Sequence, residues 1–196
     1  AGTYQFCSGT YHTSIDVQED ANLVSLGDVI LDGGDQTTIV NISVDGKDIS
    51  ISDMTLQNGA GSQFIFSSYS ESGGAIACHG HSNLTLSQLE LVNNTADVGG
   101  GLISVRCDVD IDEVLFESNS AEFGGGIYFV EGDLQISDSE FFNNDAVEGG
   151  GGLSSGSSTY TTAINIDNTQ FLNNSADFGG GVHVFEASLS IVDSSF

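Results

Sequence analysis

The chain has 196 residues, which is long enough for one domain with a continuous core. It carries 28 acidic side chains but only two basic ones, Lys47 and Arg106, so its formal net charge is −26. This charge excludes nucleic acid and anionic membrane surfaces as direct partners. No apolar run has the length of a membrane-spanning helix, so we expect no direct membrane insertion by this segment.

Residues 1–47 predict the irregular first coils of a single domain that spans residues 1–196. Three segments of this part read as short strands or as strands that run into turns: residues 14–17, 29–34 and 38–46. Three aromatic side chains, Tyr4, Phe6 and Tyr11, precede them, and we expect these to cap the open end of the core.

Residues 48–196 contain a regular repeat. The motif Phe-x-x-Asn-x-Ala leads into a glycine triplet in copies that begin at Phe116, Phe141 and Phe171, and another copy begins at Leu91. Successive copies start 25 or 30 residues apart, and Phe196 opens a further one after 25. A fixed period of this size is typical of stacked repeats, in which each unit buries its apolar side against its neighbours.

Each repeat opens with a segment in which apolar and polar side chains alternate, as around Leu84 and Leu86 or Val109 and Ile111. Alternation with period two is the pattern of a strand with one buried face, and no stretch carries a helical stripe. The sequence therefore predicts an all-β fold, a parallel β-helix with coils of about 25 residues stacked about 4.8 Å apart. We expect a right-handed helix, because parallel crossovers overwhelmingly are.

The motif residues predict the corners of these coils. The asparagines are expected to stack in one column, where they would tolerate left-handed backbone geometry and bond to one another through their amides. The column contains Asn58, Asn94, Asn119, Asn144 and Asn174. The glycine triplets mark a corner that needs a positive φ or a close backbone approach between coils.

The paired motifs resemble those of polymorphic outer membrane protein repeats, FxxN and GGA(I/L/V). The segment Gly73-Gly74-Ala75-Ile76 matches the second motif, and the recurring Phe-x-x-Asn matches the first. The resemblance covers residues 48–196, and it implies a right-handed β-helical passenger like those of autotransporter adhesins. Later copies depart from the family pattern, because they read Gly-Gly-Gly and one opens with Leu91 instead of Phe.

Two insertions break the period, residues 63–72 and 154–162, and both are rich in Ser, Tyr and Gly. We expect them to loop out of the stack and to carry adhesion, since loops commonly hold binding surfaces. Phe196 begins a motif that the sequence does not complete, so we expect a segment of a longer chain or a subunit of an end-to-end fibre.

The three cysteines leave two interpretations open. Cys78 and Cys107 lie about one coil apart, so a disulfide between adjacent coils is expected in an oxidising compartment, with Cys7 left over. Buried free thiols are the alternative.

An outward acidic array is the candidate metal site. In register, Asp48, Asn83, Asp108 and Asp133 fall in one column, and Asp110 sits beside Asp108 on the same face. Carboxylates about 5 Å apart repel unless a cation bridges them, and oxygen ligands suit Ca²⁺. Asp108, Asp110 and Asp133 are therefore candidate Ca²⁺ ligands, with a solvated acidic stripe as the alternative.

Two further motifs are candidate sites. His79 and His81, one residue apart, could bind a metal on one side of a strand, but no third ligand is evident, and exposed histidines in a surface loop are the alternative. Four sequons are possible glycosylation sites, and the first two are preferred because they alternate outward: Asn41, Asn83, Asn93 and Asn173.

The function expected from these features is a non-enzymatic structural or adhesive stalk or fibre component, secreted or on a cell surface. Its partners would be copies of itself, other surface proteins or glycans. The alternative is a carbohydrate-active enzyme of the same fold, a polysaccharide hydrolase or lyase. Such enzymes need a basic residue beside clustered carboxylates, and neither Lys47 nor Arg106 lies in a recognisable motif. An enzyme would also show a groove along one sheet with convergent carboxylates and aromatic side chains.

Overall fold

The structure is a computed structural model that describes residues 2–61, 73–156 and 162–196. In these ranges the chain is all-β, and it contains no helix long and apolar enough to cross a membrane. The strands of these ranges form a first sheet of 13 strands, a second sheet of seven and a third sheet of two, and the pairing is parallel throughout.

The first sheet contains β1 (Gly2–Phe6), β2 (Gly9–His12), β4 (Ala21–Ser25), β5 (Val29–Asp32), β7 (Asp48–Gln57), β9 (Asn83–Val92), β11 (Asp108–Asp112), β12 (Leu115–Glu117), β15 (Gly132–Ser137), β16 (Glu140–Phe142), β19 (Thr162–Asp167), β20 (Gln170–Leu172) and β22 (Ser188–Val192). The second sheet contains β3 (Ile15–Val17), β6 (Val40–Ser43), β8 (Ile76–His79), β10 (Leu102–Val105), β14 (Ile127–Val130), β18 (Leu153–Ser155) and β21 (Val182–His183). The third sheet contains β13 (Ser120–Phe123) and β17 (Asp145–Glu148).

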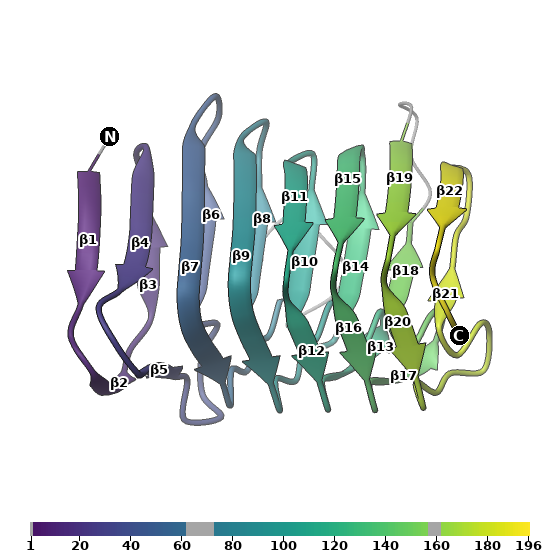
Figure 1. Ribbon diagram of the computed structural model, residues 1–196, viewed down its shortest axis with the longest axis horizontal. Helices are drawn as coiled ribbons and strands as arrows, with labels where there is room; N and C mark the ends of the chain where they lie inside the picture. The colour runs from purple at the N-terminus through teal and green to yellow at the C-terminus, as the bar shows by residue number, and fades with distance from the viewer. Residues whose placement is uncertain (1, 62–72, 157–161) are drawn as a thin grey trace.

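The strands follow one another along the long axis of the molecule in chain order (Figure 1). In the regular part, bonded partners such as Asn119 and Asn144 lie 25 residues apart, and β9, β11 and β15 pair with the same offset. The offset rises to 35 between Asp48 and Asn83 and to 30 between Asn144 and Asn174, because one of the two sequence insertions falls within each of these steps. Each full repeat thus adds one strand to the second sheet, and to the first sheet either one long strand, as β9, or two short ones, as β11 and β12.

The alternation in the sequence becomes a buried and an exposed face. In β9, Leu84, Leu86 and Leu91 are at most 1% exposed, whereas Asn83 and Thr85 face solvent. The strand bends at Gln88, where φ is 52°, so two consecutive side chains face outward and the apolar ones that follow return to the core side. Left-handed geometry at a single residue redirects the chain in this way without ending the strand pairing.

The asparagine column predicted from the motif is present for four residues, and Asn94, Asn119 and Asn144 are fully buried. The Nδ2 of each donates to the Oδ1 of the next asparagine at 2.9 Å, and the series ends at Asn174. Each Nδ2 also donates to a strand carbonyl, as Asn119 does to Leu91 at 2.9 Å. A buried amide remains stable in this position because its donors and acceptor all find partners.

Asn58 does not belong to this column, contrary to the sequence prediction. β7 pairs Leu56 with Leu91, which places Gly59 in the register of Asn94. The amide N–H of Gly59 donates to Asn94 Oδ1 at 2.8 Å and so takes the place of an asparagine at this end. The side chain of Asn58 instead donates to Asp32 at 3.1 Å.

The left-handed backbone geometry also lies elsewhere than predicted. It belongs to the residue that precedes each buried asparagine, with φ of 56° at Asn93, Asn143 and Asn173 and 55° at Ser118. This residue turns the corner and faces outward, whereas the asparagine after it points into the core. Asparagine tolerates this geometry better than most side chains, which explains the recurring Asn-Asn pair.

Stacked rings and glycines fit together inside the repeats. Phe116, Phe141 and Phe171 stack face to face with centroids 4.6 Å apart. A Cβ at Gly101 would lie 2.9 Å from Cδ1 of Phe116 and 2.7 Å from the carbonyl oxygen of Gly126, so this corner needs glycine. The third glycine of each triplet therefore makes room for the ring of the next repeat.

The Gly-Gly-Ala copy has the matching exception. Ala75 is in register with Gly101, and Leu91 is in register with Phe116. The repeat that follows the alanine thus presents a leucine side chain, which is smaller and more adaptable than a phenylalanine ring. Ala75 and Leu91, the two departures from the family pattern, therefore compensate each other sterically.

The first residues of the loop predicted at 154–162 belong to a strand instead. Ser154 and Ser155 lie in β18, are buried, and pair with Tyr128 and Phe129. The strand continues because Leu153 follows its glycines as Ile127 does one repeat before, so the register is kept. Residues 157–161 of this loop, and residues 63–72 of the other, lie outside the described residues.

Candidate functional site

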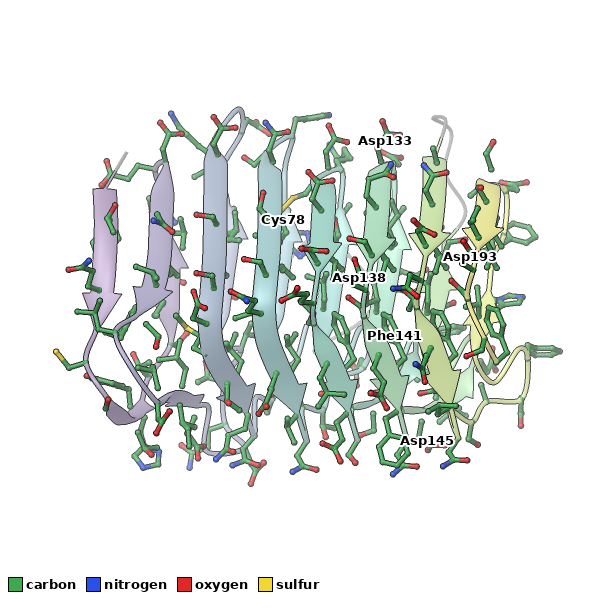
Figure 2. The ribbon with its side chains drawn as sticks, viewed as in Figure 1. Cys78, Asp133, Asp138, Phe141, Asp145 and Asp193 are labelled. Atoms are coloured by element: carbon green, nitrogen blue, oxygen red, sulfur yellow. A yellow bond between two sulfur atoms is a disulfide. The ribbon has the colours of Figure 1, made fainter. Side chains whose placement is uncertain are left out.

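Opposite charges meet on the turns that lead from the second sheet into the first. The charged rim is defined here as Asp45, Lys47, His81, Arg106 and Glu131. These residues occupy the turns after β6, β8, β10 and β14, which follow one another along the molecule. Cys78 and Asp133, labelled in Figure 2, lie near this edge. Both basic residues of the chain are therefore on one rim.

One ion pair and one contact between a histidine and a carboxylate join consecutive turns of the charged rim. Arg106 Nε lies 3.5 Å from Glu131 Oε2, and both residues have left-handed backbone geometry, with φ of 68° and 61°. His81 donates its amide N–H to Asp45 Oδ1 at 2.8 Å, and its Nδ1 lies 3.3 Å from the same oxygen. The hydrogen bond from the backbone N–H of His81 holds the pKa of Asp45 below its usual value, and the hydrogen bond with the His81 imidazole is the second cause.

These pairs could not be predicted from the sequence, because the partners lie in different repeats. His81 and Asp45 are 36 residues apart, and no local motif links them. The available signal was the register: both residues occupy the same turn of consecutive repeats, as do Arg106 and Glu131.

The predicted acidic column is in register, and one oxygen in each of two of its carboxylates accepts a hydrogen bond from the protein. Asn83 Nδ2 donates to Asp48 Oδ1 at 2.7 Å, and the amide N–H of Asp133 donates to Asp108 Oδ1 at 2.9 Å. The amide side chain of Asn83 also separates the carboxylates of Asp48 and Asp108, which lessens the repulsion between these two.

The three candidate Ca²⁺ ligands do not converge. Asp110 projects outward from β11 and has Thr85 and Gln135, not carboxylates, beside it on the neighbouring strands. In residues 2–61, 73–156 and 162–196, no group of three or more His, Cys, Asp or Glu is placed to hold a metal ion. Asp108, Asp110 and Asp133 thus do not form such a group among the described residues, and Ca²⁺ binding by them stays a prediction from the sequence.

The two histidines have different environments. His79 ends β8 and is half-buried, and burial, followed by the charge of Arg106, lowers its pKa to about 4. Its imidazole is therefore neutral at physiological pH. The side chain of His81 is 70% exposed beside Asp45. His79 does not fit the expectation of two exposed histidines, since it lies at the end of a strand rather than in a loop.

A disulfide lies below the charged rim. Cys78 of β8 and Cys107, which directly precedes β11, are fully buried and bonded to each other, with their Cα atoms 6.3 Å apart. The bond joins two adjacent repeats beside the turn that carries Arg106. Cys7 is an exposed free thiol.

Two cavities on this side of the molecule gather polar side chains. A pocket of about 220 Å³ on the charged rim is lined by His81, Arg106, Asp108 and Glu131. A groove of about 360 Å³ crosses β1, β4, β7 and β9, and its polar side chains include Asp20. Neither is lined by an aromatic side chain, so neither has the combination of carboxylates and rings expected of a polysaccharide-cleaving groove.

The sequons differ in accessibility. Asn83, Asn93 and Asn173 are exposed, and the latter two occupy the left-handed corner before a buried asparagine. Asn41, preferred from the sequence, is only half exposed, and its Oδ1 is buried while its Nδ2 donates to Ser14 at 3.3 Å. Asn41 alternates with the buried Val40 and Ile42, as the sequence predicts, and glycosylation at this residue stays a prediction.

Comparison with known families adds one finding to this geometry. Residues 113–130, which contain one Phe-x-x-Asn motif and the glycine triplet after it, match the model of the Chlamydia polymorphic membrane protein repeat. The chain therefore carries a segment similar to a polymorphic membrane protein repeat. The repeat indicates a family of surface and outer-membrane proteins. Comparisons with curated proteins and with solved structures gave no match.

Proposed function

We propose that this polymorphic membrane protein repeat-like chain is a structural and adhesive element, secreted or on a cell surface, without enzymatic activity. Its architecture would be a right-handed parallel β-helix with coils of about 25 residues, a single domain across residues 1–196. The observation that carries the proposal is the unbroken register of parallel strands, with the asparagine column and the stacked rings running through it.

The mechanism would be geometric. In such a stack the hydrogen bonds between repeats run along the long axis, so pulling on the ends loads many bonds together rather than one after another. The buried amides of Asn94, Asn119 and Asn144 add a second line of bonds parallel to the first. A short chain thereby becomes a stiff spacer that holds a binding surface away from its point of attachment.

Adhesion would be directed to other surface proteins, glycans or copies of the same chain. The net charge of −26 keeps acidic rods apart and favours partners that carry positive charge. The loops at 63–72 and 157–161 remain candidate contact segments on sequence grounds, since insertions in repeat proteins commonly carry the binding surface.

A polysaccharide-cleaving enzyme is the second candidate, because the rim pocket holds Asp108 and Glu131 near His81 and Arg106. General acid and base catalysis needs carboxylates free to exchange protons with the substrate. Here Glu131 is paired with Arg106, and Asp108 accepts the amide N–H of Asp133. These pairings favour a structural use of the rim charges.

One experiment separates the two candidates. Beads coated with the purified chain would be tested for adhesion to cell surfaces and for release of reducing ends from neutral and acidic polysaccharides. The proposal expects more adhesion than with heat-denatured chain and no release of sugar. Sugar release that is lost in both Asp108→Asn and Glu131→Gln would establish the enzyme instead, and absence of adhesion on all surfaces would remove the adhesive role.

A further inference from the structure

A third cavity lies among the first four strands, at the purple end of the molecule in Figure 1. Its volume is about 420 Å³, within the usual range of pockets that hold a small ligand or one large side chain. Three aromatic residues line it, Tyr4, Phe6 and Tyr11. It differs in this respect from the polar groove and from the rim pocket.

The rings are held in place by specific contacts. Phe6 and Tyr11 pack edge to face with centroids 5.6 Å apart, and the Tyr11 hydroxyl donates to the carbonyl of Cys7 at 2.9 Å. The Tyr4 hydroxyl donates to Glu19 Oε1 at 3.3 Å. β1 and β2 pair with β4 and β5, so the backbone that carries these rings is part of the first sheet.

The cavity has an apolar floor and an acidic margin. Val17, Ala21 and Leu23 form part of the floor, and each is at most 6% exposed. Asp16 and Glu19 line the margin and are exposed. The sequence contains no lysine or arginine before Lys47, so no cation of these types from this part of the chain neutralises the two carboxylates.

These features specify the ligand chemistry. Aromatic faces together with carboxylates attract an organic ammonium group, and the field of a chain with charge −26 repels anions. An aliphatic stem with an ammonium head matches an apolar floor with an acidic margin, and a lysine side chain has this form. Arginine also carries a positive charge and stacks on aromatic faces, but lysine has the longer aliphatic stem with which to cover the apolar floor.

We propose that this cavity is a docking pocket for a lysine side chain presented by a polypeptide partner. The methylene stem lies on Val17 and Leu23, and the ammonium group lies between the aromatic rings and the carboxylates of Asp16 and Glu19. The inference rests on the proposed adhesive role and deepens it, because it names the partner as a protein surface that carries accessible lysine.

The test uses two probes that differ only in the ammonium group. Nα-acetyl-lysine methylamide and Nα-acetyl-norleucine methylamide would be titrated into the whole chain while the ring signals of Tyr4 and Tyr11 are followed by NMR. The expected result is saturable shifts with the lysine probe and at least about tenfold weaker binding of the norleucine probe. Equal binding of both probes would make the cavity merely apolar and would overturn the proposal, as would the absence of shifts with either.

Matched variants separate the pocket from the overall charge. Asp16→Asn with Glu19→Gln should weaken binding of the lysine probe about tenfold. Asp110→Asn with Asp133→Asn removes the same charge from the outward face of the first sheet and should change it less than about twofold. Equal losses in the two double variants would show that only the general field attracts the probe, which would overturn the proposal.

The adhesion assay keeps this inference apart from the proposed function. Acetylating the lysines of the target surface should reduce adhesion of the coated beads. Adhesion that survives acetylation, with no shifts at Tyr4 and Tyr11, would remove the pocket and leave the adhesive role standing. Saturable binding of the lysine probe without adhesion to any surface would remove the adhesive role and leave the pocket.

Discussion

At the scale of single residues, a few buried polar groups keep the repeats in register. Asn119 donates through Nδ2 to Asn144 and to the carbonyl of Leu91, and it accepts bonds from both the amide N–H and the Nδ2 of Asn94. The side chain thus uses nearly all of its bonding capacity inside the core. Removing it would leave several buried groups unpaired at once.

We therefore expect Asn119→Ala to lower the free energy of unfolding by about 3 kcal/mol, because each buried unpaired group costs roughly 1–3 kcal/mol. Urea unfolding would measure the change. Thr95→Ala is the control, since Thr95 is exposed and its hydroxyl lies 3.1 Å from the Ser120 hydroxyl; this substitution should change stability by less than about 0.5 kcal/mol. Similar effects of the two substitutions would contradict a special role for the buried amide.

The fit between glycine and ring makes a second prediction. Gly101→Ala should destabilise the fold by about 1–3 kcal/mol, because the new methyl group would press on Phe116 and on the Gly126 carbonyl. Phe116→Leu alone should also destabilise, through the space it leaves. The double variant reproduces the natural pair Ala75 and Leu91, so it should cost less than the two single effects added together.

The measurement is a double-mutant cycle by urea unfolding, with the interaction expected to be at least about 0.5 kcal/mol in favour of the double variant. Additive single effects would show that Ala75 and Leu91 are unrelated substitutions. In that case the alternation between Gly-Gly-Ala and Gly-Gly-Gly would have no steric explanation in this fold.

At the scale of elements, the sequence predicts the features that recur in each repeat. It does not predict the features that depend on which residues of neighbouring strands are paired. The strand faces and the column of Asn94, Asn119, Asn144 and Asn174 leave a periodic mark, so they could be predicted. Asn58 was misassigned because two adjacent positions carry asparagine in several repeats, and only the pairing of β7 with β9 shows which one points inward. The partial burial of His79 at the end of β8 depends on packing that no spacing in the sequence encodes.

The same limit applies to the candidate sites. The charged rim could not be predicted, because the partners of Arg106 and His81 come from other turns. The outward phase of Asp108, Asp110 and Asp133 predicts Ca²⁺ ligands, but phase does not show that amides donate to one oxygen each of Asp48 and Asp108. The N-terminal cavity was foreshadowed only by the three aromatic residues at the start of the chain.

His79 in the second sheet gives a prediction at this scale. Its pKa is about 4 in the folded chain and about 6.5 when unfolded, so the unfolded state binds the proton first as the pH falls. The neutral imidazole makes its full contribution to the free energy of unfolding above pH 6.5, and this contribution is lost progressively as the pH falls toward 4. The loss reaches on the order of 3 kcal/mol at the lower end.

His79→Gln removes this titration while keeping a polar side chain of similar length. The difference in unfolding free energy between the two proteins, measured by urea at several pH values, should fall steadily between pH 6.5 and 4 and stay constant above 7. Comparing the two proteins cancels the carboxylates that titrate in the same range. A difference that does not depend on pH would contradict the burial of a neutral imidazole.

At the scale of the whole molecule, repulsion among like charges opposes the packing described above. The net charge is −26, and at 0.01 M ionic strength the Debye length is about 30 Å, so carboxylates on neighbouring strands repel one another with little screening. Salt screens these interactions without touching the amide column or the stacked rings. Stability should therefore depend on ionic strength more than in a protein of balanced charge.

We expect the midpoint of thermal unfolding to rise by several degrees between about 10 and 500 mM NaCl, as screening takes hold. Circular dichroism would follow the transition. Micromolar CaCl₂ added at constant ionic strength should give no saturable increase, because the described carboxylates do not form a metal-binding group. A saturable rise with Ca²⁺ that is lost in Asp108→Asn with Asp133→Asn would restore the metal site.

The complementarity of ring and glycine also bears on how such arrays lengthen. A copy that opens with phenylalanine and ends in three glycines leaves, on its far side, the hollow that another phenylalanine copy fills, as Phe116, Gly126 and Phe141 do. We therefore expect a tandem duplicate of that copy to pack against its parent without a compensating change elsewhere. The copy that contains Ala75 does not leave this hollow. We therefore expect duplication to be favoured among the copies that follow Leu91 in the chain, and not in the copy that contains Ala75.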